Sequence, residues 1–261
     1  VLALLSPLLA LHIENLERLK VNLDEIINIC SDGRPPGIKM LYVGPPMFSH
    51  APGWPKYCSE LPASSSSGIH IIQLTGLQTI MVYCEMNRKD GGWTVIQKNY
   101  RDTPVSCDES WSTYQHGFGN VHTEFWLGTE YLHQITRQKI YQVRFVIWDA
   151  SNNIKFADYN LFSPDDESQS YQLRLGAHSG TAEGAMASKG TITMHDNMKF
   201  SAKDWDQDTS TGNCATSSRG GWWYSACYSV RLNFKGAMTW CNLSQGSCRA
   251  LAILIKPITY C

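Results

Sequence analysis

The sequence predicts an α+β domain with short strands, short helices and long loops, and three observations indicate this fold class. Short runs of β-forming residues recur from residue 57 onward, separated by loops rich in Gly, Ser, Asn and Asp. Only two stretches among them have helical character. Nine cysteines are spread along the 261 residues without CxxC spacing, which favours disulfides in an oxidising compartment over a zinc ribbon.

The predicted strands are residues 69–74, 80–84, 93–97, 141–148, 171–175 and 251–255. The predicted helices cover residues 110–116 and 124–138. Strands interspersed irregularly with few helices are typical of α+β domains rather than of repeats or bundles. Loops of this length need disulfides or a metal ion to hold them in place.

Three parts are expected along the chain. Residues 1–30 hold an apolar start and a short amphipathic helix, residues 31–55 form a linker rich in Pro and Gly, and residues 56–261 form the domain. A stretch with this many prolines cannot be the interior of a helix or a central strand. Residues 1–10 (VLALLSPLLA) are either the remnant of a secretory signal or the start of an apolar helix.

The helix over residues 11–30 carries apolar side chains at alternating steps of three and four, with Lys20 as one polar intruder. This heptad pattern predicts either a short coiled coil that forms a homo-oligomer, with Cys30 able to bridge two chains, or a helix that packs on its own domain or frays. A helix this short is marginal alone.

Charge and motifs exclude several function classes. The formal net charge is -1 and the pI is near 6.8, so no general affinity for nucleic acid is expected. No apolar run is long enough for a membrane span. The sequence contains no GxSxG, HExxH or phosphate-binding glycine motif, and its eight histidines are scattered. We therefore expect a binding protein rather than an enzyme.

The acidic stretch within residues 200–227 carries the clearest site chemistry. Asp204, Asp206 and Asp208 alternate, and in an extended or looped backbone alternate side chains point the same way. Calcium prefers six to eight oxygen ligands, which carboxylates and the carbonyls of a following turn supply. The alternative is a solvated acidic loop.

With its flanking motifs, this stretch resembles the fibrinogen C-terminal domain family, which includes fibrinogen chains, ficolins, angiopoietins and tenascins. The matching motifs occur in the family's order: VYCEM at 82–86, GGWTVIQ at 91–97, GFGN at 117–120, EFWLG at 124–128, ADYNLF at 157–162, HDNMKFSAKDWDQD at 195–208, GNCA at 212–215 and GGWWYSAC at 220–227. The resemblance covers roughly residues 57–257. It implies a globular domain with mixed, mainly antiparallel sheets and loops fixed by disulfides and calcium.

The resemblance also implies site residues. By position, the calcium carboxylates are Asp206 and Asp208, and the backbone carbonyl donors are Ser210 and Gly212. The implied disulfides are Cys58–Cys84 and Cys214–Cys227. The family often has a cis peptide bond where Ala226 joins Cys227, and its ligand pocket lies beside this bond.

The sequence departs from the family at that pocket, whose expected residues are Ala226, Cys227, Tyr228 and Trp240. Tyr228 replaces the usual histidine, and a Gly-rich loop before Trp240 is largely missing. This change puts an inherited ligand specificity in doubt.

Cysteines 241 and 248 are additional to the family pattern. Cys241 and Cys248 either pair or remain two thiols, and Cys30, Cys107 and Cys261 are left over, one of which can bridge chains. Asn242 begins an Asn-Leu-Ser glycosylation triplet.

The resulting expectation is a secreted, non-enzymatic recognition module in the extracellular space, with one structural calcium ion, that binds a receptor or matrix protein. The alternatives are a ficolin-like lectin for acetylated sugars and a decayed paralogue without a working pocket.

Overall fold

The computed structural model describes residues 53–76, 78–87, 90–187, 193–236, 238–240, 243 and 248–258. These residues belong to the compact unit Pro52–Cys261. The predicted coiled coil with Cys30, most of the linker, the glycosylation triplet at Asn242, and Cys241 and Cys261 lie outside the described residues. No described helix is long and apolar enough to cross a membrane.

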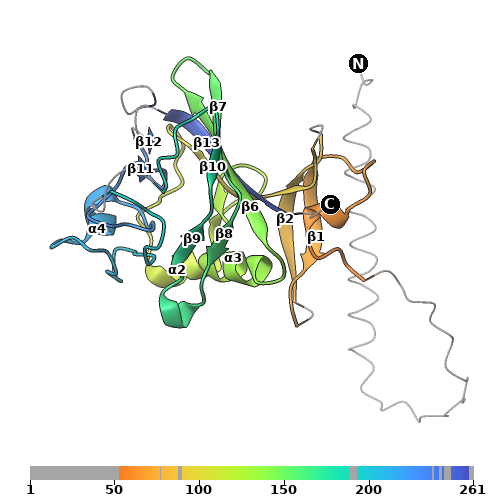
Figure 1. Cartoon of the computed structure of the whole chain (residues 1–261), viewed down its shortest axis with the longest axis horizontal. Coiled ribbons are helices and arrows are strands. Elements are labelled where there is room, and N and C mark those ends of the chain that lie inside the picture. The colour runs from red at the N-terminus through yellow and green to blue at the C-terminus, as the bar shows by residue number, and fades with distance from the viewer. Residues whose placement is uncertain are drawn as a thin grey trace, which may run out of the picture. The chain divides into compact units, whose positions relative to one another are not determined.

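A sheet of nine strands organises the domain (Figure 1). Seven strands follow one another in the order β1 (Gly68–Gln73), β2 (Thr79–Glu85), β3 (Trp93–Tyr100), β13 (Cys248–Pro257), β6 (Tyr141–Asp149), β7 (Ile154–Tyr159) and β10 (His178–Gly180). The short strand β5 (Phe125–Trp126) pairs with β3 and with β4 (Phe118–Gly119). Every described strand pair is antiparallel.

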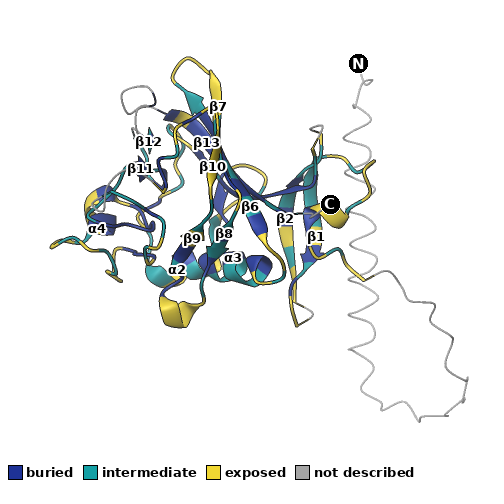
Figure 2. Cartoon of the chain, viewed as in Figure 1, coloured by how far each residue is buried: buried dark blue, intermediate teal, exposed yellow. Residues whose placement is uncertain are grey.

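The strand nearest the C-terminus occupies the centre of this sheet. β13 pairs with β3 on one side and with β6 on the other. Because a central strand is covered on both faces, its sequence is apolar almost throughout rather than alternating. Figure 2 shows buried residues concentrated along β13 and β6, and exposed residues at loops and turns.

The two faces of the sheet pack against different clusters. The main core includes Phe145, Ile147 and Ile253, together with most of the buried aromatic residues. A smaller cluster covers the opposite face and consists of Trp93, Val95, Phe125, Val146, Ala252 and Leu254. Alternation of side chains along each strand produces this division.

Two smaller sheets and short helices complete the fold. β8 (Phe162–Pro164) pairs with β9 (Leu173–Leu175), and β11 (Val230–Arg231) pairs with β12 (Thr239–Trp240). The α-helices are α2 (Trp111–His116), α3 (Thr129–Thr136) and α4 (Cys214–Ser218). One-turn 3-10 helices occur at Cys58–Glu60 and Glu167–Gln169. In Figure 1, α4 and β11–β12 lie at the opposite end of the domain from β1–β2.

The predicted helix over residues 110–116 is confirmed as α2, whose N-cap Ser110 accepts a hydrogen bond from the Thr113 N–H. The prediction over residues 124–138 is wrong in its first part. Phe125 and Trp126 form β5, and helix α3 starts only at Thr129. Gly128 has φ 117 and separates the two elements, because this backbone conformation is incompatible with a continuing helix.

All six predicted strands correspond to strands of the structure, although the run at 171–175 begins as a strand only at Leu173. Tyr171 has a left-handed φ of 50 and precedes it. Strand β7 was missed, and so were the shorter strands β4, β5, β8, β10, β11 and β12, because strands of two or three residues have no periodicity to detect.

Candidate functional site

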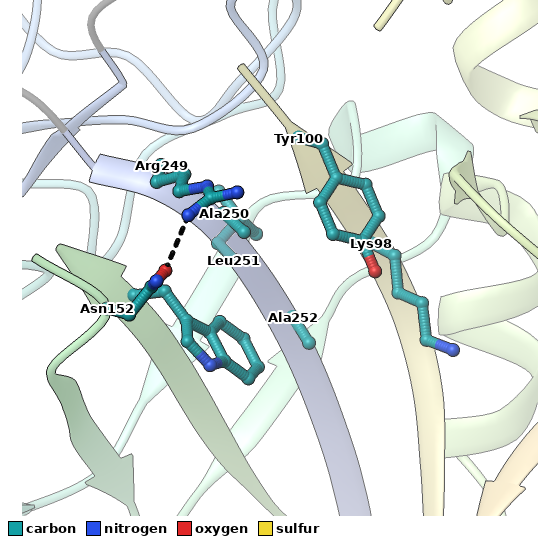
Figure 3. A pocket seen from close by; sticks show the side chains of 8 residues that line it. Lys98, Tyr100, Asn152, Arg249, Ala250, Leu251 and Ala252 are labelled. Carbon is teal, nitrogen blue, oxygen red and sulfur yellow. Dashed lines mark hydrogen bonds between the residues drawn. The ribbon is translucent and has the colours of Figure 1, made fainter. Parts of the chain in front are cut away.

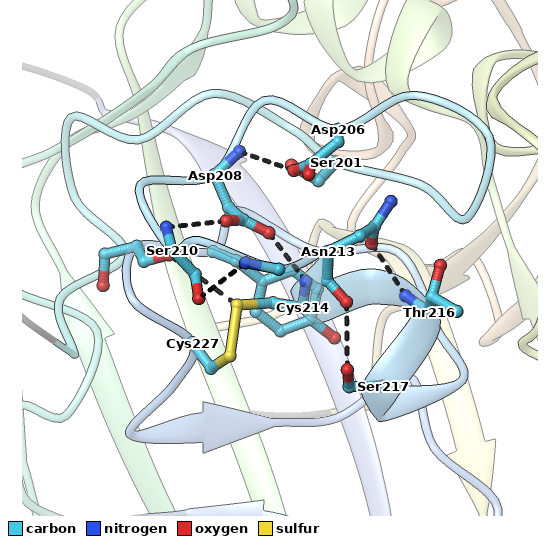
Figure 4. Close-up of a disulfide and its surroundings, with 12 residues drawn as sticks. Ser201, Asp206, Asp208, Ser210, Asn213, Cys214, Thr216, Ser217 and Cys227 are labelled. Atoms are coloured by element: carbon cyan, nitrogen blue, oxygen red, sulfur yellow. Dashed lines mark hydrogen bonds between the residues drawn. A yellow bond between two sulfur atoms is a disulfide. The ribbon is translucent and has the colours of Figure 1, made fainter.

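The acidic loop at residues 206–212 is folded by its own side chains (Figure 4). The Asp206 carboxylate accepts a hydrogen bond from the Asp208 N–H at 3.2 Å. The Asp208 carboxylate in turn accepts from the Ser210 N–H at 2.8 Å, and the Ser210 hydroxyl accepts from the Gly212 N–H at 3.4 Å. Each bond closes a turn between a side chain and the residue two places on, the conformation that Asp and Ser favour.

Asp208 also ties this loop to the second disulfide. Its Oδ2 accepts a hydrogen bond from the Cys214 N–H at 2.7 Å. Cys214 is disulfide-bonded to Cys227, with Cα atoms 5.3 Å apart, and the Thr209 N–H donates to the Ser225 carbonyl at 3.1 Å. One backbone hydrogen bond, from Thr209 to Ser225, and the disulfide, to which Asp208 is linked through the Cys214 N–H, therefore hold the acidic loop against residues 225–227.

The third aspartate of the alternating trio has a different role. Asp204 Oδ1 accepts from the Trp111 N–H at 2.7 Å, at the first residue of α2. A helix leaves its first N–H groups without internal partners, and an acidic side chain satisfies one of them. Asp204 therefore stabilises a helix start, and only Asp206 and Asp208 remain together.

The electrostatics of the remaining pair suit a bound cation. Burial raises the pKa of the Asp208 carboxyl, and the charge on Asp206 adds to that rise, although the N–H bonds from Cys214 and Ser210 oppose it. Two adjacent carboxylates repel each other, and a cation would offset this repulsion. Each carboxylate keeps lone pairs beyond those used by the N–H groups.

This donor set fits calcium. Within the described part of the chain, no three His, Cys, Asp or Glu side chains form one metal-binding group. An ion here would therefore draw its other oxygens from backbone carbonyls, such as those of Ser210 and Gly212, and from water, which calcium accepts readily.

The segment 220–227 beside the loop is fixed by close backbone packing and aromatic burial. A Cβ on Gly220 would lie 1.8 Å from the Asn233 carbonyl oxygen, so only glycine fits there. Trp222 and Trp223 are fully buried with ring centroids 5.1 Å apart, and the Trp223 indole N–H donates to the Tyr171 carbonyl at 2.7 Å. A buried indole whose N–H has a hydrogen-bond partner anchors the segment 220–227.

The residues expected to form the ligand pocket lie next to an arginine that contacts two aromatic rings. The Arg231 guanidinium lies 4.9 Å from the centre of the Tyr228 ring and 3.8 Å from that of Phe234. Ala226, Cys227 and Tyr228 are all half-buried. No cis peptide bond occurs in the described residues, so Ala226–Cys227 is trans, and Cys227 has φ 95. Of these three residues, Tyr228 contacts Arg231, which also contacts the ring of Phe234.

Trp240, which was expected to line the pocket, is a buried residue in this structure. Its side chain is fully buried, its ring centroid lies 5.2 Å from that of Phe145, and its indole N–H donates to the Glu183 carbonyl at 2.9 Å. It pairs with Val230 in β11–β12 and belongs to the main core cluster.

The cysteines follow the family pattern only in part. Cys58–Cys84 and Cys214–Cys227 are bonded, as the resemblance implied. For Cys241 and Cys248, either a pair or two thiols was expected, and the described residues include only Cys248, which is free and buried. Cys248 begins β13, where its N–H donates to the Met238 carbonyl at 3.0 Å and its side chain is fully buried. Cys107 is also free and buried.

Sequence reasoning missed the part played by Lys235. Its ammonium donates to Asn99 Oδ1 and Thr103 Oγ1, both at 2.8 Å, and forms an ion pair with the buried Glu124. It also borders a cavity of about 640 Å³ together with Arg219 and Arg231. The only available signal was a lysine within the shortened segment 232–240, which resembled an ordinary surface residue.

Comparison with known proteins gives a consistent result. Residues 55–246 match the family described as "Fibrinogen beta and gamma chains, C-terminal globular domain". The chain is 44% identical over 203 residues to a fibrinogen-like protein 1-like protein of Gallus gallus, covering 77% of this chain and 72% of that protein.

Solved structures agree with this match. The fibrinogen-like globe domain of human ANGPTL2 has a TM-score of 0.71 and 31% identity, covering 78% of this chain and 99% of that domain. A second structure is lamprey fibrin D-dimer, complexed with the peptide ligand Gly-His-Arg-Pro-amide, with a TM-score of 0.73 and 27% identity. The match covers 98% of this chain and 88% of the lamprey chain.

Proposed function

The chain belongs to the family of fibrinogen C-terminal globular domains, and from this membership we propose that it is a secreted, non-enzymatic recognition module that binds an extracellular receptor or matrix protein. The observation that carries the proposal is the family match over residues 55–246. Two bonded cysteine pairs support the extracellular setting, because disulfides persist in oxidising compartments.

The proposal includes one structural calcium ion at the acidic loop. Asp206 and Asp208 would supply carboxylates, and Ser210 and Gly212 would supply backbone carbonyls. The bound ion would neutralise the two carboxylates and hold the loop against the Cys214–Cys227 disulfide. The carboxylates that would hold the ion already serve as acceptors for loop N–H groups, which favours a structural role.

The lectin alternative has less support. A pocket for acetylated sugars would need open space beside Cys227 with aromatic walls. Tyr228 instead lies over Arg231, and Trp240 is buried in the core. A protein surface therefore remains the better candidate partner.

The test uses the full chain, produced by secretion from mammalian cells, in calcium buffer. We expect a cooperative thermal transition, and binding to at least one member of an array of extracellular receptor and matrix proteins. A chain that is secreted and folded but binds only acetylated glycans on a parallel array would replace this proposal with the lectin function. A chain without a cooperative transition would favour the decayed paralogue.

A further inference from the structure

A groove crosses the face of the main sheet that carries the smaller cluster, away from the acidic loop. Its volume is about 440 Å³, and we name it the sheet-face groove. Its lining includes Lys98, Tyr100, Trp148, Arg249, Ala250 and Ala252. Figure 3 shows Tyr100 and Lys98 on β3 beside Ala250 and Ala252 on the central strand β13.

Strand register explains why this face is hollow. Ala250 pairs with Tyr100 on one side and with Trp148 on the other, so the three residues form one row across the sheet. Neighbouring strands lie about 4.8 Å apart, which places the backbones of the two aromatic residues roughly 10 Å apart. Because the alanine between them carries only a Cβ, the floor of the groove is low between the two aromatic residues, and both line its volume of about 440 Å³.

The walls of the groove are held in place before any ligand arrives. The Tyr100 N–H donates to Glu124 at 3.3 Å, and the Tyr100 carbonyl accepts from the Lys235 ammonium at 3.1 Å. Tyr100 is nevertheless 42% exposed. At one end of the groove, the Arg249 guanidinium donates to Asn152 Oδ1 at 2.9 Å (Figure 3). Preorganised walls reduce the entropy lost on binding.

The described charged side chains that line the groove all have the same sign. Among the described residues that line it, Lys98 and Arg249 are basic and none is acidic. The Lys98 ammonium lies 3.5 Å from the centre of the Tyr83 ring, and burial lowers the pKa of this amine despite the nearby Glu85 charge. The lysine is thus partly desolvated and incompletely neutralised, and an incoming carboxylate would stabilise it.

We propose that the sheet-face groove binds an acidic peptide segment of the partner protein, which inserts one apolar side chain between Tyr100 and Trp148 and places carboxylates near Lys98 and Arg249. This inference rests on the proposed function, because it names the partner chemistry of the recognition module. A sugar fits less well, since sugar hydroxyls need several side-chain acceptors and the lining offers few. The exposed Ile154, which pairs with Trp148, extends the apolar surface beyond the groove.

The test measures fluorescence anisotropy of a labelled hexapeptide that carries a central Leu-Phe pair between two Asp and two Glu residues. A control peptide has Asn and Gln in place of the acids. We expect the acidic peptide to bind the full chain, and Tyr100→Ala or Arg249→Glu to weaken binding by roughly tenfold each. Raising the salt concentration should weaken binding of the acidic peptide to the unchanged chain. Lys199→Glu is the matched charge-reversal control, because Lys199 is exposed and does not line the groove.

Equal binding of the amide peptide, equal binding by the Tyr100 and Arg249 variants, or no binding of the acidic peptide at millimolar concentration would each overturn the inference. Binding of a uronate oligosaccharide in its place, lost in the same variants, would also overturn it. Unchanged melting temperatures of the variants establish that any loss is local. If partners found on the receptor array still bind the double variant Tyr100→Ala/Arg249→Glu, the groove is wrong while the recognition function stands.

Discussion

Nδ1 of His195 lies 2.7 Å from the carbonyl oxygen of Trp223, and this contact helps to set the protonation state of the fully buried imidazole ring. The opposite nitrogen, Nε2, accepts a hydrogen bond from the Val230 N–H at 3.0 Å. A carbonyl only accepts and an amide N–H only donates, so the ring must be neutral with its proton on Nδ1. His195 therefore joins Trp223 to Val230, the first residue of β11.

This geometry predicts an acid-sensitive fold. Burial lowers the pKa of His195 from 6.5 to about 4, and the bond to Trp223 only partly opposes this shift. Between these values the unfolded chain binds the proton and the folded chain does not, so stability is complete above about pH 6.5 and falls as pH drops towards 4. The expected slope from this residue is up to about 1.4 kcal/mol per pH unit.

Urea unfolding between pH 7 and pH 4 measures this slope. His195→Gln should reduce stability at pH 7 and flatten the slope, whereas His122→Gln, at an exposed position, should leave both unchanged. A slope that survives His195→Gln would assign the acid sensitivity to other groups.

The acidic loop predicts a calcium-dependent melting temperature. With calcium at about 100 times its Kd, binding to the folded state adds about 2.7 kcal/mol. For a domain of this size this corresponds to a rise of roughly 5–10 °C over chelator buffer. Asp206→Asn and Asp208→Asn should each reduce most of this difference, because each removes a carboxylate ligand.

Asp204→Asn is the matched control for the calcium prediction. Asp204 caps the start of α2, so its loss should lower the melting temperature by a similar amount with and without calcium. A calcium response that persists in both the Asp206 and Asp208 variants would contradict the site assignment.

The ion pair between Lys235 and Glu124 predicts a strong energetic coupling. Lys235→Met should destabilise the domain by about 3 kcal/mol, because Glu124 is buried and would lose its counter-charge. Lys235→Met with Glu124→Gln should cost less than Lys235→Met alone. A double-mutant cycle from urea unfolding measures the coupling, and additive single effects would show that the two residues act independently.

The free thiols of Cys107 and Cys248 should be inert in the folded protein. Burial raises the pKa of Cys107 to about 11, although Lys235 opposes the shift, and burial likewise raises the pKa of Cys248. Because the thiolate is the reactive form, iodoacetamide at pH 8 should leave both unmodified until denaturant is added. Peptide mass mapping reads each site separately, and rapid native labelling of either one would contradict its burial.

The sequence by itself determined most of the family-specific features of this protein. The ordered motifs indicated the family that the match over residues 55–246 shows, and the implied pairings Cys58–Cys84 and Cys214–Cys227 are both present. These features depend on local spacing, turn chemistry and glycine positions, which are written directly in the chain. The neighbouring carboxylates of Asp206 and Asp208 follow from the same local geometry.

Only the tertiary structure decided which distant residues meet. The apolar run at 251–255 gave no sign that β13 would lie between β3 and β6, or that Ala250 would open a groove between Tyr100 and Trp148. Trp240 resembled a pocket wall and is a core residue, while Lys235 resembled a surface residue and pairs with buried Glu124. Strand order and burial depend on contacts between segments far apart in the chain, and these contacts leave no periodicity in the sequence of either partner.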